Sequence, residues 1–377
     1  MPVSPRPRVL LLIPHLGGGG SERVMALLAR GLSAEKYELH LGLVTQTKAF
    51  EEGVSTLVHL HFLGAPRVRA GALRLLQLVR RVKPVLILSG IFHLIFLVLL
   101  LRPFFPRETR VLVRQNGTVS SALAFGGLPW NARSLYRLLY RHADRVICQT
   151  RAMARDLTEE LKISEDRLVV LPNPVDFEEI RNSSGADQHL WSGPGPHLLA
   201  VGRLSREKGF DLLLQALALV RKKIVDADLL IAGTGPEEAA LKAECRELGL
   251  DQAVRFAGHL ACPWACLPDA ALFVLPSRHE GLPNALLEAA AGGLPIVALP
   301  ASEGVVELLH GQAGVWLAPA ISAEALAASL LTALHALRQG ERFAHSFVNE
   351  FRIGSAIQAY EELIDATLAT APRTKKS

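Results

Sequence analysis

The stretch PSRHEGLPNALLEAAAGG, residues 276–293, carries two glutamates, Glu280 and Glu288, eight positions apart. It follows a short apolar run, residues 272–275, which is typical of a buried strand. A turn containing glycine and proline comes next, and a helix is predicted to begin near Asn284. Open α/β sheets bind ligands beyond the carboxyl ends of their strands, and the free N–H groups of a helix N-terminus attract anions. The stretch therefore predicts an α/β fold with a site for a ligand that has an anionic head and a hydroxylated tail.

Short apolar strands alternate with helical segments on the N-terminal side of this stretch and beyond it, as in an open parallel sheet with helices on both faces. In the first half of the chain, strands are predicted at residues 9–13, 39–44, 85–89, 111–114 and 145–149. In the second half they are predicted at residues 197–201, 229–232, 254–257, 272–275 and 295–299. The repetition predicts two doubly wound, Rossmann-like domains in series, and 377 residues suffice for two domains.

The domain boundary is indicated by a change of composition. The strand pattern restarts after LPNP, residues 171–174, and residues 182–196 are rich in Gly, Pro and Ser, as a linker or surface loop is. We therefore predict an N-terminal domain at 1–181 and a C-terminal domain at 182–350. Residues 351–377 are predicted to hold a last helix, near 355–368, and a polar, basic tail.

Charge is divided unevenly between the two halves. Residues 1–173 contain 24 Lys and Arg against 12 Asp and Glu, a balance of +12, whereas the remainder has a balance of −7. An excess this concentrated indicates an anionic partner for the first half, with ordinary solvated surface charge as the alternative. Four cysteines without a paired framework indicate a reducing compartment. The first apolar run ends at Pro14 without a cleavage site, so it is predicted to be a buried strand and not a signal peptide.

Residues 85–101 contain no charged side chain over 17 positions. A membrane-spanning helix needs about 20 apolar residues, and this run is interrupted by Ser89-Gly90 and by His93. We therefore expect a strand followed by an apolar helix at 91–101. Part of this helix is expected in the core and part at a bilayer surface, because an apolar face with a basic rim binds anionic lipid.

Two further loops are suited to phosphate. Residues 201–209 (VGRLSREKG) place Arg203 and Lys208 five positions apart after a predicted strand, where a guanidinium and an ammonium can hold a diphosphate. The glycine run at 17–20 precedes a helix for which Ser21 is the expected N-cap, and such a run allows close backbone approach to an anion. The alternative for both loops is an ordinary solvated turn.

Several other chemistries lack their motifs. IAGTGP, residues 231–236, lacks the third glycine of the dinucleotide fingerprint, and no P-loop occurs, so NAD and ATP are not supported. Asp226 and Asp228 precede a strand instead of following one. The spacing of the histidines and cysteines fits no usual zinc pattern; these residues are His259, Cys262, Cys266 and His279. No hydrolase elbow is present, and basic residues without RNA-binding aromatic motifs exclude nucleic acid as a predicted partner.

The motifs taken in order resemble those of the family-4 retaining glycosyltransferases, which have the two-domain GT-B fold. The resemblance covers nearly the whole chain. It rests on GGSERV at 19–24, LPNPVD at 171–176, VGRLSREKGFD at 201–211, IAGTGPE at 231–237, VRFAGHL at 254–260, FVLPSRHEGLPNALLEAAAGGLPIVA at 273–298 and GVVELLHGQAGVWLAP at 304–319. Glu280 and Glu288 match the family's E-x7-E motif.

This resemblance implies two domains facing a cleft, with the nucleotide-sugar on the C-terminal domain, the acceptor on the N-terminal domain, and the last helix crossing back onto the N-terminal domain. Arg203 and Lys208 would hold the diphosphate and neutralise the departing nucleotide. Glu288 would accept hydrogen bonds from the ribose hydroxyls. Glu280 would contact the transferred sugar and complete the catalytic set.

Backbone groups are implied to supply the remaining donor contacts. Gly281, Leu282, Pro283 and Asn284 would line the sugar, Gly258 and Leu260 would lie near the base, and Gly19 and Gly20 would touch the phosphates from the other domain. UDP is expected as the nucleotide in preference to GDP. No cofactor and no metal are expected, because arginine, lysine and helix N-termini supply the positive charge.

The chain departs from the family at one acceptor-side position. Many relatives have a histidine where this chain has Asn116, in the sequence Arg114-Gln115-Asn116-Gly117. We therefore assign no acid/base histidine and expect Asn116, Arg114 and Glu22 on the acceptor side. Retention in this family is usually explained by attack on the same face of the sugar as the leaving group, so no nucleophile is required.

GGSERV and LPNPV also resemble enzymes that build lipid-linked glycans, lipopolysaccharide and other surface polysaccharides. Together with the basic first half, they imply a peripheral enzyme at the cytoplasmic face of the membrane, with a lipid-linked or polysaccharide acceptor and an anionic membrane surface as partners. Two alternatives remain at this stage. One is a GT-B-fold sugar-nucleotide epimerase, and the other is a non-catalytic sugar-nucleotide-binding scaffold.

Overall fold

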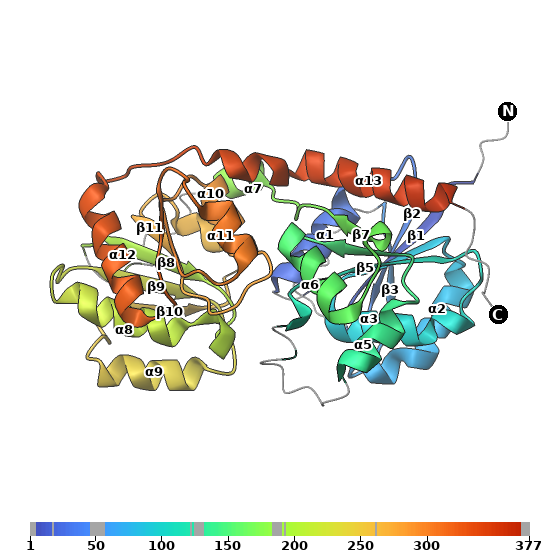
Figure 1. Cartoon of the computed structure of the whole chain (residues 1–377), viewed down its shortest axis with the longest axis horizontal. Helices are drawn as coiled ribbons and strands as arrows, with labels where there is room; N and C mark the ends of the chain where they lie inside the picture. Colours follow the sequence, from blue (N-terminus) through green and yellow to red (C-terminus); the bar gives the residue numbers. More distant parts are fainter. Residues whose placement is uncertain are drawn as a thin grey trace. The chain divides into compact units, whose positions relative to one another are not determined.

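The computed structural model describes residues 5–16, 19–45, 57–120, 123, 132–182, 191, 194–260 and 262–370. The chain divides into two compact units (Figure 1). The first unit combines Met1–Pro174 with Ile353–Ser377, and the second is Val175–Arg352. The sequence placed the break after residue 181, whereas the structure places it after Pro174.

Residues just beyond Pro174 are held by the second unit. The backbone N–H of Val175 donates to the carbonyl of Phe351 at 2.8 Å. The guanidinium of Arg352 lies 4.4 Å from the ring centroid of Phe177, the first residue of helix α7 (Phe177–Asn182). The buried apolar side chains of α7 share a core with those of α10 (Asn284–Ala291). The boundary therefore lies at LPNP and not at the Gly/Pro/Ser-rich segment.

The first unit contains a parallel sheet with the strand order β3-β2-β1-β4-β5-β6-β7. Its strands are β1 (Arg8–Ile13), β2 (Glu38–Leu43), β3 (His59–Phe62), β4 (Leu86–Ser89), β5 (Arg110–Arg114), β6 (Arg145–Cys148) and β7 (Leu168–Val170). Its main helices are α1 (Gly20–Gly31), α2 (Ala72–Val82), α3 (Phe92–Leu101), α5 (Ala132–Tyr140), α6 (Arg151–Leu161) and α13 (Ile353–Ala369). The five inner strands are those predicted from apolar runs, whereas the two edge strands, β3 and β7, were not predicted.

The second unit repeats this architecture with the order β10-β9-β8-β11-β12-β13, again entirely parallel. Its strands are β8 (His197–Val201), β9 (Asp228–Ala232), β10 (Val254–Gly258), β11 (Leu272–Leu275), β12 (Ile296–Ala298) and β13 (Val315–Leu317). Besides α7 and α10, its helices are α8 (Phe210–Arg221), α9 (Glu238–Glu247), α11 (Glu303–Leu309) and α12 (Ala323–Ala336). Two doubly wound α/β units confirm the predicted fold class.

Helix α13 belongs to the first unit, although it lies at the far end of the sequence (Figure 1). Its apolar face, with Tyr360 fully buried, shares a core with α1 and β1. Lys36 donates to the Glu361 carboxylate at 2.6 Å, and the hydroxyl of Tyr37 donates to Asp365 at 2.6 Å. The last helix thus returns to the first unit, as the fold prediction required.

The apolar helix expected at 91–101 is α3, and most of it lies in the core of the first unit. Leu94, Val98 and Leu99 are fully buried, whereas Leu100 and the nearby Phe104 are exposed. The burial explains the uncharged run without a bilayer. Among the described residues, no helix is both long and apolar enough to cross a membrane.

Candidate functional site

The carboxyl edge of the second unit's sheet gathers most of the predicted donor-side residues. Strand order reverses there, because β9 and β10 lie on one side of β8 whereas β11, β12 and β13 lie on the other. The loop after β8 carries Arg203 and Lys208, and the loop after β11 carries Glu280. Ligands of open α/β sheets bind at such a switch point.

Lys208 and Glu280 are in direct contact although 72 positions separate them. The Lys208 ammonium donates to the Glu280 carboxylate at 2.6 Å, and the Ser277 hydroxyl donates to the same oxygen at 2.7 Å. The Glu280 side chain is 8% exposed and that of Lys208 is 28% exposed. The pair therefore forms a partly buried cluster at the switch point. Arg203 lies exposed on the same loop.

Gly209 makes this approach of the two loops possible. Its φ is +66°, in the left-handed region, and a Cβ there would lie 2.0 Å from the carbonyl oxygen of Pro276. Any larger residue would separate the β8 loop from the β11 loop. The contact between Lys208 and Glu280 therefore depends on a glycine at this position.

An ion pair that the sequence analysis did not identify fixes the β11 loop. Arg278 binds Asp211, in the first turn of α8, through two bonds of 2.6 Å. The Arg278 guanidinium also donates to the carbonyl of Arg206 at 3.0 Å. Burial alone would raise the pKa of Asp211, but the hydrogen bond and charge of Arg278 lower it below its ordinary value. The spacing of 67 positions offers no local signal from which this pair could be found.

Glu288 lies on the second turn of α10 and is 8% exposed. The helix begins at Asn284, as predicted, and the residues before it are buried: Gly281, Leu282 and Pro283. The first backbone N–H groups of a helix have no carbonyl acceptor within the helix, and they project beyond its N-terminal end. The E-x7-E motif therefore supplies one carboxylate on the loop and one inside the helix.

The glycines of IAGTGP have a packing role. Gly233 has a φ of +150°, and a Cβ there would lie 1.8 Å from the carbonyl oxygen of Gly202. The N–H of Leu204 donates to Thr234 at 3.0 Å, and the N–H of Gly233 donates to Gly258 at 2.7 Å. These contacts bind the β8, β9 and β10 loops to one another. Leu260, two residues past β10, is half-buried at the same edge.

The first unit presents its own predicted residues at the carboxyl edge of its sheet. Helix α1 begins at Gly20 with Gly19 as N-cap, and Glu22 lies in its first turn. The prediction that Ser21 caps this helix is therefore wrong, because the helix begins at Gly20, two residues before the expected start at Glu22. Gly17 and Gly18, the rest of the predicted glycine run, lie outside the described residues.

Arg114 and Asn116 are joined in one hydrogen-bond network at the end of β5. Arg114, 1% exposed, donates to Asn116 and, at 2.5 Å, to Asn173 of LPNP. The Asn116 amide in turn donates to the carbonyl of Gly90, just after β4. Asn116 is thus held from both ends of its amide. Arg114 is thus a buried cation that donates to two neutral amides.

Cys266 is one of the histidines and cysteines whose spacing fits no usual zinc pattern. Cys266 is buried and donates to the carbonyl of Pro263 at 2.9 Å, and burial raises the pKa of its thiol to about 12. Such a thiol is protonated near neutral pH. Within the described ranges, no group of three or more His, Cys, Asp or Glu is placed to hold a metal ion.

Two protein families match the two parts of the chain. Residues 18–179 match the family described as Glycosyltransferase Family 4, and residues 195–336 match Glycosyl transferases group 1. A relative in Campylobacter jejuni is 28% identical over 311 residues, which are 79% of this chain and 82% of the relative. Its name is N-acetylgalactosamine-N,N'-diacetylbacillosaminyl-diphospho-undecaprenol 4-alpha-N-acetylgalactosaminyltransferase. The amylovoran biosynthesis glycosyltransferase AmsK of Erwinia amylovora is 36% identical over 152 residues, 38% of this chain and 36% of that protein.

Solved structures show the same fold. HepE of Anabaena in complex with UDP and glucose superposes with a TM-score of 0.78 at 18% identity, covering 96% of this chain and 100% of that one. The lipopolysaccharide outer core galactosyltransferase WaaB superposes with a TM-score of 0.64 at 16% identity, covering 95% and 99%.

Proposed function

Because the chain is a glycosyltransferase of family 4 with the GT-B fold, we propose that it moves a hexose-type sugar from a nucleotide-sugar to a lipid-linked or polysaccharide acceptor, with retention of configuration. We infer UDP as the nucleotide, and a reaction without a metal ion at the cytoplasmic face of the membrane. The observation that carries the proposal is the contact between Lys208 and Glu280 at the switch point of the second unit's sheet.

The donor would be held at this switch point. Lys208 and Arg203, on the loop after β8, would bind the diphosphate, and Glu280 would contact the transferred sugar. Glu288, within α10, would accept hydrogen bonds from the ribose hydroxyls. The first N–H groups of α10 and the residues before it would add backbone contacts to the sugar.

The reaction would break the bond between the anomeric carbon and the diphosphate oxygen, and would form a bond from that carbon to the acceptor oxygen. Attack on the same face as the departing group keeps the configuration. The proton of the acceptor hydroxyl passes to the departing phosphate oxygen. The negative charge that develops there would be stabilised by the partly buried Lys208 and by the exposed Arg203 on the same loop. A fixed cation in a partly buried site acts more strongly than one in water.

A lipid-linked acceptor is supported by the name of the Campylobacter relative, which includes a diphospho-undecaprenol. The structures of HepE with UDP, with UDP and glucose, and with UDP-glucose support UDP. The acceptor side would lie at the carboxyl edge of the first unit, where Asn116 is fixed by its network and Gly19 caps α1.

A transfer assay with UDP-sugars and a polyprenyl-diphosphate glycan acceptor tests the proposal. Lys208→Ala should lower kcat/KM by about 10²–10³-fold, as the loss of one charge-stabilising group does. The matched control is Lys242→Ala on α9, which removes a Lys–Glu pair of nearly equal length, 2.7 Å, from Glu238. Chelator should leave the rate unchanged, and NMR should show the donor's anomeric configuration in the product.

Other results would point to the alternatives. An epimerised UDP-sugar formed without acceptor would identify an epimerase, and binding of a UDP-sugar without turnover would identify a scaffold. Full activity of Lys208→Ala would contradict the assigned donor site.

A further inference from the structure

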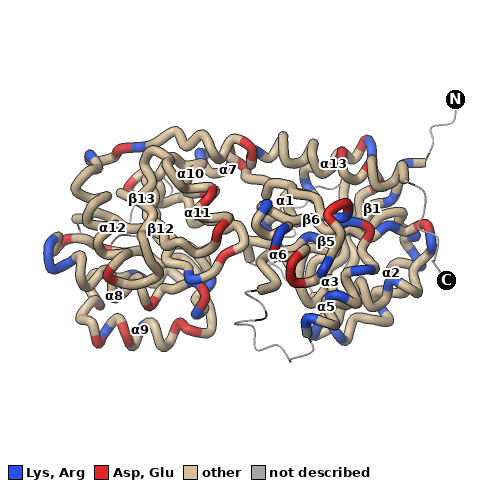
Figure 2. The backbone as a smooth tube through the Cα atoms, in the orientation of Figure 1, with Lys and Arg blue, Asp and Glu red and all other residues tan. Residues whose placement is uncertain are grey.

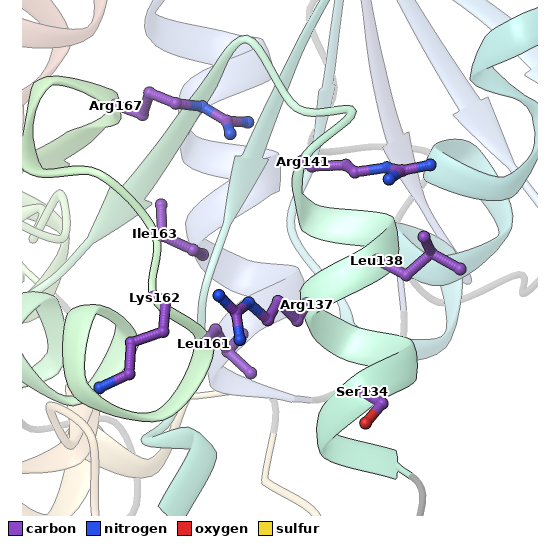
Figure 3. A pocket seen from close by; sticks show the side chains of 8 residues that line it. All are labelled: Ser134, Arg137, Leu138, Arg141, Leu161, Lys162, Ile163 and Arg167. Atoms are coloured by element: carbon purple, nitrogen blue, oxygen red, sulfur yellow. The ribbon is translucent and has the colours of Figure 1, made fainter.

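Lys and Arg gather around α5 of the first unit, whereas Asp and Glu lie among them around α8 and α9 of the second (Figure 2). The charged residues that line a cavity of about 360 Å³ beside α5 are all cations: Arg137, Arg141, Lys162 and Arg167 (Figure 3). Arginine and lysine side chains donate hydrogen bonds but accept none. A hydroxyl that donates needs an acceptor, and the second unit provides one in Glu280.

The carboxylate of Glu280 is held through only one of its oxygens. Oε1 accepts from the Lys208 ammonium at 2.6 Å and from the Ser277 hydroxyl at 2.7 Å. No hydrogen bond to Oε2 comes from the described residues, and Oε2 is not fully buried. Each carboxylate oxygen has two lone pairs, so protein donors saturate Oε1, whereas Oε2 is available to a ligand.

The two donors to Oε1 differ in their freedom to move. Ser277 is 1% exposed and lies two residues after β11. The Lys208 side chain is 28% exposed, and its ammonium lies at the end of a flexible stem with three N–H donors. The ammonium can therefore turn toward an anion, whereas the short, buried serine side chain stays within reach of Glu280.

Backbone contacts already fix the loop that carries Glu280. The N–H groups of Arg278 and His279 donate to the carbonyl of Glu207 at 2.8 and 3.4 Å. The N–H of Glu280 donates to the carbonyl of Ala301 at 3.3 Å. Two neighbouring segments thus hold the main chain at this position. The direction of the carboxylate depends instead on the bonds to Oε1.

A bound diphosphate would change the balance between these two bonds. Its oxygens would attract Lys208 and would repel the Glu280 carboxylate, because opposite charges attract and like charges close together are unfavourable. If Lys208 were the only donor, the carboxylate would be free to rotate once the ammonium turned to the phosphate. A buried neutral hydroxyl resists this rotation, because leaving Ser277 without its acceptor costs free energy.

We propose that Ser277 is a positioning residue for the transfer reaction. It holds Oε1 of Glu280 in place while Lys208 binds the diphosphate, so that Oε2 accepts a hydrogen bond from a hydroxyl of the transferred sugar. The donor sugar must then present a hydroxyl that donates to Oε2. This inference rests on the proposed function, because it takes a nucleotide-sugar as the ligand of the site.

Calorimetric titration of the full chain tests Ser277 with two ligands, UDP and the UDP-sugar that the wild type binds most tightly. If the wild type prefers GDP, then GDP and a GDP-sugar take their place. Ser277→Ala should leave the Kd of UDP unchanged, because UDP carries no sugar for Glu280 to contact. It should weaken binding of the UDP-sugar by about tenfold, the low end of what a hydrogen bond to a charged group contributes. The kcat of transfer should fall as well.

Ser322→Ala is the matched control. Ser322 follows the edge strand β13 and caps α12, where its hydroxyl accepts from the N–H of Ala325 at 3.1 Å. The same substitution therefore removes one hydroxyl and one hydrogen bond, but it should change neither Kd nor kcat. In a Glu280→Ala background, Ser277→Ala should cause no further loss of UDP-sugar affinity, because the serine acts through that carboxylate.

Three results would overturn the proposal: an unchanged affinity of Ser277→Ala for the UDP-sugar, equal weakening of UDP and the UDP-sugar, or additive losses from Ser277→Ala and Glu280→Ala. Equal weakening would mean that the serine only supports the loop. A wild type that binds a UDP-sugar but transfers nothing would count against the proposed function and leave the titration of Ser277 valid. A wild type that binds no nucleotide-sugar would contradict both.

Discussion

Gly209→Ala is expected to disable the site without touching any side chain in it. The left-handed backbone at φ +66° costs a residue with a Cβ about 1–2 kcal/mol. The new Cβ would also lie 2.0 Å from the Pro276 oxygen, where real contacts stay beyond 3.0 Å, so the two loops must part by about 1 Å. Overpacking of that kind adds about 1–3 kcal/mol. The variant should therefore be destabilised by about 3 kcal/mol in all.

The same displacement should break the 2.6 Å contact between Lys208 and Glu280. A misplacement of 1 Å costs about 10²-fold in rate, so kcat/KM should fall by about that factor. Gly249→Ala is the matched control, because its φ is +68° but nothing lies within 4 Å of its Cβ position. Gly249→Ala should lower the free energy of unfolding by about 1 kcal/mol and leave kcat/KM unchanged. Urea unfolding and the transfer assay measure both effects. Equal stability and activity of the two variants would refute the role given to Gly209.

Two other predictions concern polar contacts that hold loops in place. Because Arg278 lowers the pKa of Asp211, the pair stabilises the folded protein above the ordinary carboxyl pKa and loses that effect as pH falls through the lowered one. Between pH 7 and pH 3, the melting temperature of the wild type should therefore fall more steeply than that of Asp211→Asn. Parallel falls in the two proteins would contradict a stabilising ion pair between Arg278 and Asp211. Arg114→Gln should cost about 3 kcal/mol, since it removes charge-assisted bonds to Asn116 and Asn173, and should lower kcat more than it changes the donor KM. If Arg114→Lys, which keeps the charge, restores kcat fully, charge and not the position of Asn116 would be the cause.

The inner strands were predictable because burial on both faces leaves an apolar run that can be read directly. All side chains of β4 and β5 are buried, for example. The strands that were missed, β3, β7 and β13, are edge strands of three or four residues with no fully buried side chain. Because these strands are not fully buried, their sequences lack the apolar run that would distinguish a strand from a loop.

The candidate site was predictable where its residues follow strands or begin helices, as Glu280, Lys208 and Asn284 do. The contacts between loops were not. The sequence shows that positions 209 and 233 are glycines, but it does not show why glycine is needed there. The carbonyl oxygen that each glycine faces belongs to another loop. The pair of Arg278 with Asp211 joins positions that only the fold brings together. Local sequence patterns therefore predict which loops form the candidate site. The contacts between those loops depend on tertiary packing and cannot be predicted from such patterns.

The return of α13 to the first unit has a consequence for synthesis of the chain. The second unit is complete once residue 352 has been made, although it starts later in the sequence. The first unit must wait for Ile357, Tyr360 and Ile364 to cover Val24 and Leu28 of α1. The two units are therefore completed in the reverse of the order in which they start along the sequence. Until the final turns of α13 emerge, the nascent first unit keeps an apolar face open to chaperones.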